Sequence, residues 1–353
     1  MSMTPLIEKL SMNHEIDVLT TSYQLPDDFS LKFNLWINTH NFRVKYIKSK
    51  HRLFSTSYIF HGLSIIKNYD QVHLSSLFFF PNLIFATFAI LNNRKVYWSF
   101  HGELLKPALR IKYWKKFIYL FFIRTITKYL FIRATSKDEA IRVEEVLGKS
   151  HIKIIPNFFD IDVVCNLKKN NQLMFLGRIS PIKKIENLIL ACSKSKLFID
   201  KEYKLIVGGP KDDKFIKYFH SIIRQINELD LQEQIFLIGN LKSPEKERYL
   251  AQSKALFLVS DSENFGNVVI EALAQGTPVI ATKGTPWSIL ETTGSGFWID
   301  NSPIDIACCI DKLIGLTEEK YQEMCQNASH LAKMYSSEAV MGDWLRFIHE
   351  VHN

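Results

Sequence analysis

The chain has 353 residues, of which 47% are hydrophobic and 23% charged, a composition that excludes disordered and fibrous proteins and suffices for one large domain or two of ordinary size. Its five cysteines form no C-x-x-C pair, which argues against a zinc ribbon or a disulfide-rich secreted fold and favours a reducing compartment. The net charge of +8 is concentrated in residues 1–160, where 22 Lys and Arg stand against 12 Asp and Glu, so we expect this half to meet an anionic partner.

The first half of the chain alternates short β-rich runs with helical patterns. Its first twenty residues have neither a long apolar core nor a cleavage site, so no signal peptide is expected. Residues 71–93 carry no Asp, Glu, Lys or Arg, but their apolar core is short and is interrupted by Pro81 and Asn82, which favours a buried strand and helix over a membrane span. Strands are predicted at residues 16–21, 42–49, 71–76, 95–101, 129–136 and 152–157.

The second half repeats the pattern, with strands predicted at residues 172–178, 203–209, 234–239, 255–260, 277–283 and 296–300. Strands that are nearly continuous in Val, Ile, Leu and Phe, each flanked by a helix, are typical of parallel sheets covered on both faces. Two such sets predict an α/β protein with two doubly wound domains. Ligands of such sheets bind at the carboxyl ends of the strands, so we expect the site in the cleft between the domains.

The segment FLGRISPIKKIENLILA places Gly177 and Arg178 at the end of a strand and Lys183 and Lys184 at the start of a helix. A guanidinium and an ammonium beside a helix N-terminus form a site for a phosphate or diphosphate. Taken alone, the pattern is more typical of solvated basic residues at a turn.

The segment SDSENFGNVVIEALAQGTPVIAT makes the prediction more specific. Glu263 follows a strand and Glu271 lies in the next helix, on either side of Gly266 and Asn267. Gly266 permits close approach of the backbone to a ligand, and the N–H groups after it are suited to phosphate. The carboxylates are suited to sugar hydroxyls, and a nucleotide sugar offers both kinds of group.

These two segments resemble the donor-binding signature of the retaining, GT-B-fold glycosyltransferases of family 4, also called group 1. IIPNFFD, LIVGGPKDD and FLIGNL resemble the family's intermediate segments, and YWSFHGELLKPAL and ATSKDEA match it less tightly in the first half. The resemblance implies two Rossmann-like domains with an interdomain cleft. We expect an acceptor domain at residues 1–160, a donor domain at 161–335 and a helix at 336–353 that packs back on the first domain.

The resemblance also implies roles for individual residues. Arg178 and Lys183 neutralise the donor diphosphate, and Glu271 accepts hydrogen bonds from the ribose. Glu263 and His101 contact the transferred sugar. The predicted site thus has His101, Arg178, Lys183 and Glu263 as catalytic residues and Gly177, Lys184, Phe265, Gly266, Asn267 and Glu271 as donor-binding residues. The family often has glycine where this chain has Lys184.

Transfer by this family implies retention of configuration, with charge on the leaving diphosphate stabilised by the Arg–Lys pair. We therefore expect no metal and no other cofactor. Asp160-Ile161-Asp162 spells the D-x-D of metal-dependent glycosyltransferases, but it follows Pro156-Asn157 at the domain junction, and we expect a structural role for it. Asp212 and Asp213 are predicted to cap a helix.

Residues 108–133 hold seven Lys and Arg, eight aromatic residues and no Asp or Glu. Basic and aromatic side chains interleaved on a helix are typical of contact with an anionic membrane surface. A purely structural role in the core of the domain is equally compatible with the pattern. Single-stranded nucleic acid offers phosphates and stacking partners too, but we expect no nucleic acid partner.

The chain departs from the family at its beginning. Its first predicted strand starts at residue 16, whereas the family opens with an earlier strand and a Gly-rich turn that approaches donor and acceptor. The N-terminal first strand is therefore expected to be missing, either because the gene product begins further upstream or because this chain lacks part of its cleft. In the second case the protein is a non-catalytic relative that binds a nucleotide sugar or a membrane.

We therefore expect a cytoplasmic glycosyltransferase, peripheral on the inner face of the membrane, that moves a sugar from a nucleotide-diphosphate donor to a glycan or lipid-linked acceptor. Surface polysaccharide or lipopolysaccharide biosynthesis is the pathway class that this reaction suits. The alternatives are the non-catalytic relative, a nucleic-acid binder and a sugar phosphorylase.

Overall fold

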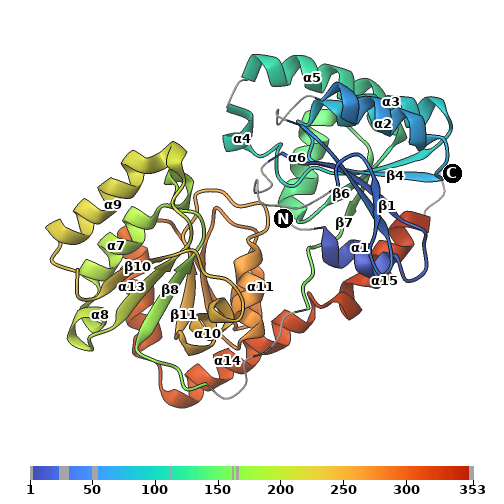
Figure 1. Ribbon diagram of the computed structural model, residues 1–353. Coiled ribbons are helices and arrows are strands. Elements are labelled where there is room, and N and C mark those ends of the chain that lie inside the picture. The colour runs from blue at the N-terminus through green and yellow to red at the C-terminus, as the bar shows by residue number, and fades with distance from the viewer. Residues whose placement is uncertain are drawn as a thin grey trace. The chain divides into compact units, whose positions relative to one another are not determined.

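The computed structural model describes residues 3–23, 32–49, 55–110, 113–160, 163 and 167–349. The chain divides into two compact units, shown in Figure 1. Unit 1 consists of residues 1–155 and 341–353, and unit 2 of residues 156–340. The observed division follows Ile155, whereas the sequence analysis places it after residue 160.

The described residues of unit 1 form two sheets. Strands β1 (Asp17–Thr21) and β3 (Arg43–Ile47) run parallel, and β2 (Trp36–Asn38) pairs antiparallel with β3. The second sheet is parallel, in the order β4 (Gln71–Ser75), β5 (Lys95–Ser99), β6 (Leu130–Ala134) and β7 (His151–Ile154). The sequence analysis predicts all of these except β2, whose three residues are too few for a recognisable alternation. No strand precedes β1 among the described residues.

The helices of unit 1 are α1 (Thr4–Leu10), α2 (Thr56–Ile66), α3 (Phe80–Leu91), α4 (Lys106–Arg110), α5 (Tyr113–Ile126) and α6 (Lys137–Leu147). The apolar run at residues 71–93 forms β4 and α3, as predicted, with Phe85, Ala86 and Ala89 buried. Among the described residues, no helix is long and apolar enough to cross a membrane.

The last helix, α15 (Ser337–His349), ends against the second sheet of unit 1. Tyr97 on β5 and Gln71 on β4 donate side-chain hydrogen bonds of 2.8 Å to the carbonyl of Ile348. The Phe347 ring meets the Tyr97 ring edge-on, at 5.0 Å between centroids. The C-terminal helix thus packs against strands β4 and β5 of unit 1.

Unit 2 has one parallel sheet, in the order β10 (Ile235–Gly239), β9 (Lys204–Gly208), β8 (Gln172–Leu176), β11 (Ala255–Leu258), β12 (Val279–Thr282) and β13 (Gly296–Ile299). Its helices are α7 (Ile185–Lys194), α8 (Lys196–Asp200), α9 (Ile216–Glu228), α10 (Glu245–Gln252), α11 (Asn267–Ala274), α12 (Ile289–Thr292), α13 (Pro303–Ile314) and α14 (Glu318–Lys333).

Side chains alternate between the two faces of this sheet along each strand, and both faces are covered. On β8, Leu173 and Phe175 pack into one apolar cluster, and Met174 and Leu176 pack into another on the opposite face. The unit is therefore doubly wound, as the sequence predicts.

Candidate functional site

The site lies at the point where the strand order of unit 2 reverses. From β8 the chain builds the sheet outward through β9 and β10, and it then returns to the other side of β8 with β11. The loops that follow β8 and β11 are therefore neighbours, and the N–H of Asp261 donates to the carbonyl of Ile182 at 2.9 Å. In open α/β sheets, this reversal leaves a crevice at the carboxyl ends of the strands where ligands bind.

The loop after β8 carries the predicted cationic residues. Lys183 pairs with Glu263, from the loop after β11, and both side chains are largely buried, at 16% and 19% exposed. Arg178 is different, because its guanidinium is 69% exposed and lies 3.7 Å from Asp212. Asp212 also accepts from the N–H of Lys214, which confirms its predicted role as a cap. Lys183 and Glu263 thus form a fixed pair of opposite charges, and Arg178 remains accessible beside them.

Lys184 has a separate structural role. It adopts the left-handed conformation, with φ of 50° and ψ of 40°, at the N-cap of α7. Its ammonium lies 3.4 Å from Asp261 and 3.6 Å from Glu186. A left-handed position is one that glycine occupies without steric cost, which gives a physical reason for the glycine that the family often has there.

Gly177 and Gly209 allow the backbones after β8 and β9 to approach closely. The N–H of Gly177 donates to the carbonyl of Gly208 at 3.0 Å. A Cβ atom at Gly209, where φ is 142°, would stand 1.9 Å from the carbonyl oxygen of Gly177. The conformation of the loop after β8 therefore depends on the close approach of the backbone after β9.

Gly266 is the N-cap of α11 and adopts a left-handed conformation, with φ of 78°. A Cβ there would stand 2.9 Å from Cδ2 of Leu258 and 3.2 Å from Cγ of Glu263, so any other residue would strain the backbone and displace these side chains. Asn267, the first residue of α11, accepts a 2.9 Å hydrogen bond from Asn157. The N-terminus of α11 and Glu263 are thus adjacent.

Phe265 contributes its backbone, rather than its ring, to the candidate site. The ring is 5% exposed and packs against Trp287 and Tyr335. The indole N–H of Trp287 donates to the carbonyl of Phe265, and the ring of Trp287 is buried. Trp287 is therefore a packing residue that fixes the turn before Gly266.

Glu271 lies in the second turn of α11 and pairs with Lys246 of α10, at 3.0 Å. Both side chains are about one-fifth exposed or less, at 16% for Glu271 and 21% for Lys246. The sequence analysis missed Lys246, because nothing in its own segment indicates that α10 meets α11. Two further polar atoms in the loop after β11, Ser260 Oγ and Asn264 Oδ1, are buried without a hydrogen-bond partner among the described residues.

His101 lies in unit 1, after β5, and its ring contacts the end of β4. Its Nε2 lies 3.0 Å from Ser75 Oγ, and its Nδ1 has no partner among the described residues. Burial, and then the positive charge of Arg133, lowers the pKa of His101 from 6.5 to about 4. The ring is therefore neutral at pH 7.

Glu139 anchors the turn that carries His101. This carboxylate, 1% exposed, accepts from the N–H of Gly102 at 2.5 Å and from both the N–H and the hydroxyl of Thr135 at 2.7 Å. The sequence analysis noted ATSKDEA but gave Glu139 no role. The role of Glu139 is seen only in its hydrogen bond to Gly102, which is 37 positions away.

Other predicted or prominent groups lie apart from this arrangement. Asp160 accepts from the N–H of Ser337 at 3.1 Å, while Ile161 and Asp162 of the D-x-D lie outside the described residues. No cluster of three metal-ligating side chains occurs among the residues that the structure describes.

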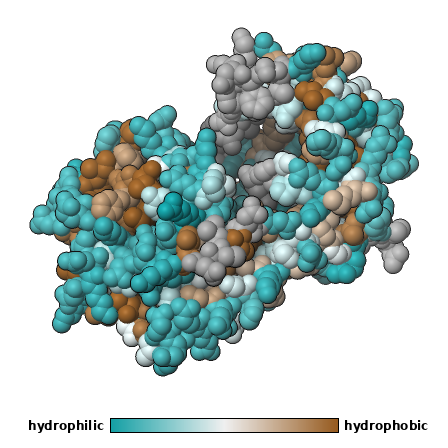
Figure 2. All heavy atoms as spheres, turned by 60° about the horizontal axis from the view of Figure 1, so that its bottom comes forward, coloured by the Kyte–Doolittle hydropathy of each residue, from teal (hydrophilic) through white to brown (hydrophobic). Residues whose placement is uncertain are grey.

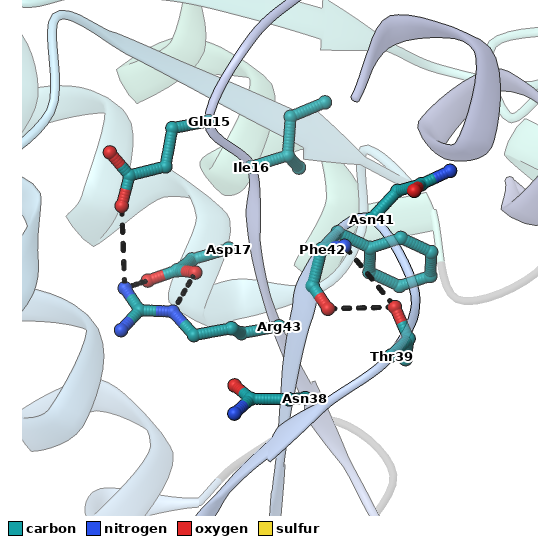
Figure 3. Close-up of a pocket in the computed structure, with 8 residues that line it drawn as sticks. All are labelled: Glu15, Ile16, Asp17, Asn38, Thr39, Asn41, Phe42 and Arg43. Atoms are coloured by element: carbon teal, nitrogen blue, oxygen red, sulfur yellow. Dashed lines mark hydrogen bonds and ion pairs between the residues drawn. The ribbon is translucent and has the colours of Figure 1, made fainter. Parts of the chain in front are cut away.

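A hollow of about 280 Å³ lies at the amino ends of β1 and β3 (Figure 3). There Arg43 donates to Asp17 at 2.7 Å and Thr39 accepts from the N–H of Phe42 at 3.2 Å, so these groups already have partners within the hollow. Because it lies at the opposite ends of the strands from a doubly wound binding crevice, we assign it no ligand.

Comparisons with known proteins match both halves of the chain. Residues 160–331 match the family Glycosyl transferases group 1, and residues 5–163 match Glycosyltransferase Family 4. N-acetyl-alpha-D-glucosaminyl L-malate synthase of Bacillus anthracis is 24% identical over 225 residues, which are 59% of this chain and 56% of that protein. GDP-mannose:cellobiosyl-diphosphopolyprenol alpha-mannosyltransferase of Xanthomonas oryzae is 24% identical over 302 residues, which are 82% of this chain and 76% of that protein.

A solved structure has a similar fold. Anabaena HepE in complex with UDP and glucose superposes with a TM-score of 0.74 at 17% identity, over 87% of this chain and 86% of that one. At this identity the likeness is one of fold, and it extends over both units of the chain.

Proposed function

Because the chain belongs to the group 1 glycosyltransferases of family 4, we propose that it transfers a sugar from a nucleotide-diphosphate donor to a glycan or lipid-linked acceptor. The observation that carries the donor class is the contact between Lys183 and Glu263 at the strand reversal of unit 2. It places an ammonium suited to phosphate beside a carboxylate suited to hydroxyls. A nucleotide sugar presents both groups a few bonds apart.

The charges of the reaction suit these residues. As the glycosidic bond stretches, negative charge grows on the leaving diphosphate and positive charge on the sugar ring. Arg178, whose guanidinium is exposed, is free to turn toward the diphosphate, and Lys183 is already held at the loop. Each such contact contributes about 2–4 kcal/mol to the lowering of the barrier, as single donors do in other enzyme sites.

The remaining donor contacts follow from α11. Its N-terminal N–H groups, after Gly266, are suited to hold sugar or phosphate oxygens. Glu271, one turn further on, is suited to accept from the ribose hydroxyls, which then compete with Lys246 for the carboxylate. Ser260 and Asn264 offer polar atoms that have no other partner among the described residues.

Retention of configuration is part of the proposal, with the acceptor attacking from the face that the diphosphate leaves. His101, neutral at pH 7, has the protonation state of a hydrogen-bond partner for a sugar hydroxyl. Its assignment to the sugar, and the absence of a metal requirement, are sequence predictions that we retain. If Arg178 and Lys183 supply the charge, transfer proceeds at an unchanged rate in EDTA, and loss of activity there contradicts this part of the proposal.

For the acceptor, the support comes from a relative that acts on a diphosphopolyprenol. We propose an acceptor of this lipid-linked class, used in surface polysaccharide assembly on the cytoplasmic side of a membrane. The non-catalytic alternative is not favoured, because both halves of the chain match glycosyltransferase families.

The first experiment is saturation-transfer NMR on the full chain with UDP-, GDP- and ADP-linked sugars. We expect selective binding of one nucleotide class, lost in the Arg178→Ala, Lys183→Ala double variant. Arg224→Ala is a matched control, because Arg224 is 72% exposed on α9 and lies beside Glu228 at 3.8 Å, much as Arg178 lies beside Asp212. Equal binding by the double variant, or none by the folded wild type, contradicts the proposed donor site.

A further inference from the structure

Large hydrophobic side chains are exposed at scattered positions over much of the molecule. On the face shown in Figure 2 they form small separate patches in a largely hydrophilic surface. Helix α5 is different, because five of them lie on this one helix. The exposed fractions are 77% for Trp114, 49% for Phe117, 59% for Ile118, 59% for Phe121 and 51% for Phe122.

These five residues form one stripe. Their spacing of three and four positions places them on the same side of a helix. The opposite side of α5 packs into the core of unit 1 through Leu120 and Ile123, which are 8% and 0% exposed. The exposed stripe therefore lies outside this apolar core. We call Trp114, Phe117, Ile118, Phe121 and Phe122 the aromatic face.

Basic residues border the aromatic face. Lys115 and Arg124 are exposed and lie on its two sides when α5 is viewed along its axis. Lys106 precedes it on α4, and Lys128 follows it, with its ammonium over the ring of Tyr129. From residue 104 to residue 137 the sequence contains no Asp or Glu. Helix α6, which contacts α5, carries the exposed acidic residues Asp138, Glu144 and Glu145, of which Glu145 pairs with Arg142 at 2.7 Å.

We propose that the aromatic face of α5 docks on the surface of an anionic lipid bilayer. A helix that presents Trp and Phe between basic side chains buries its rings at the headgroup boundary, while its Lys and Arg attract anionic headgroups. The charge complementarity selects this occupant over a second copy of the chain, since two copies of this face would bring like charges together. A surface-bound enzyme would meet a lipid-linked acceptor at the membrane.

The test is flotation of the full chain with vesicles. We expect it to rise with phosphatidylcholine vesicles that contain phosphatidylglycerol, and to stay behind with pure phosphatidylcholine or at high salt. The triple variant Phe117→Ser, Phe121→Ser, Phe122→Ser should lower binding about tenfold or more, because it removes the inserted rings. Lys115→Ala should lower it about fivefold, as expected for one charge near an anionic surface.

A matched triple variant separates this face from hydrophobicity in general. Ile304, Met334 and Ile199 are exposed by 66%, 57% and 40% in unit 2, so Ile199→Ser, Ile304→Ser, Met334→Ser should bind vesicles as the wild type does. Unchanged circular dichroism and an unchanged unfolding temperature in both triple variants show that the fold survives.

Several outcomes overturn the proposal. They are the absence of flotation, equal flotation with uncharged vesicles, and equal loss in the two triple variants. A doubled mass by light scattering that only the α5 variant abolishes assigns the face to a second copy instead. Preferential binding of a single-stranded oligonucleotide assigns it to nucleic acid. Because flotation needs no nucleotide sugar, failure here is distinguishable from failure of the donor site.

Discussion

The two units build their functional groups in different ways. In unit 2 one continuous six-stranded sheet brings the loops after β8 and β11 together, and the charged residues of the site come directly from those loops. In unit 1 the described strands divide between two sheets, and His101 is placed by the buried carboxylate of Glu139, which holds its turn, and by the hydroxyl of Ser75. Sheet topology therefore supports the site in unit 2, whereas hydrogen bonds to a buried carboxylate support His101 in unit 1.

The edges of the unit 1 strands show the same reliance on side chains. The Tyr58 hydroxyl donates to the carbonyl of Leu19 on β1, at 3.2 Å, and the Asn82 amide donates to the carbonyl of Ser75 on β4, at 2.8 Å. Side chains thus supply hydrogen-bond donors to part-buried backbone carbonyls at these edges. We therefore expect substitution of the exposed Arg178 in unit 2 to change activity with little loss of stability, and substitution of Glu139 in unit 1 to change stability first.

The largest expected effect is on catalysis in unit 2. Arg178→Ala should reduce kcat/KM for sugar transfer about 100-fold to 1000-fold, because one stabilising contact to the leaving group is lost. Its unfolding temperature should stay within a few degrees of the wild type, since the side chain is exposed. Steady-state kinetics and thermal unfolding test this, with Arg224→Ala as the control. Full activity in Arg178→Ala contradicts the assignment.

The next effect is on stability in unit 1. Glu139→Ala should lower the free energy of unfolding by about 3 kcal/mol, because three buried donors on Gly102 and Thr135 lose their acceptor. Glu145→Ala, on the same helix, removes an exposed ion pair and should cost less than about 1 kcal/mol. Denaturant unfolding measures the free energy of unfolding of both variants. Equal losses contradict the proposed role of Glu139 in holding the turn of His101.

The third effect is the pH dependence that follows from His101. Folding lowers the pKa of His101 to about 4, so the unfolded chain binds its proton at a higher pH than the folded chain. The contribution of His101 to the free energy of unfolding is fully present above pH 6.5 and is lost as the pH falls toward 4. Between pH 8 and pH 5 the loss from this group is about 2 kcal/mol.

His101→Asn isolates this contribution. The pKa of His73 is also lowered to about 4 by burial, but His73 is present in both proteins. Its contribution to the pH dependence therefore cancels in the difference between them. Denaturant unfolding at several pH values should show that the advantage of the wild type over the variant shrinks as the pH falls. A difference that is constant with pH contradicts the lowered pKa of His101.

The smallest expected change in stability is that of Lys184→Gly, in the loop after β8. Lys184→Gly should raise the free energy of unfolding by roughly 0.5 kcal/mol, because the relief of left-handed strain slightly exceeds the entropy cost of glycine. Transfer should be preserved in Lys184→Gly and lost in Lys183→Ala. The opposite pattern of activities assigns the phosphate contact to Lys184.

Much of this protein can be predicted from its sequence alone. Runs of Val, Ile, Leu and Phe indicate the buried parallel strands, because only such residues can be buried on both faces of a sheet. Gly266 is predictable because a positive φ and a close neighbour require glycine, and the family's glycine at position 184 has a similar cause. These are local properties of the backbone, which a short segment reveals.

The partners of the side chains were decided by the tertiary structure. Lys183 meets Glu263 across 80 positions, and Lys246 meets Glu271 only because α10 packs beside α11. The ring of Phe265 turns into the core, and five aromatic or apolar residues of α5 face outward although their composition suits a core equally well. A side chain's neighbours come from elements remote in the sequence, so their identity depends on how strands and helices pack rather than on any local pattern.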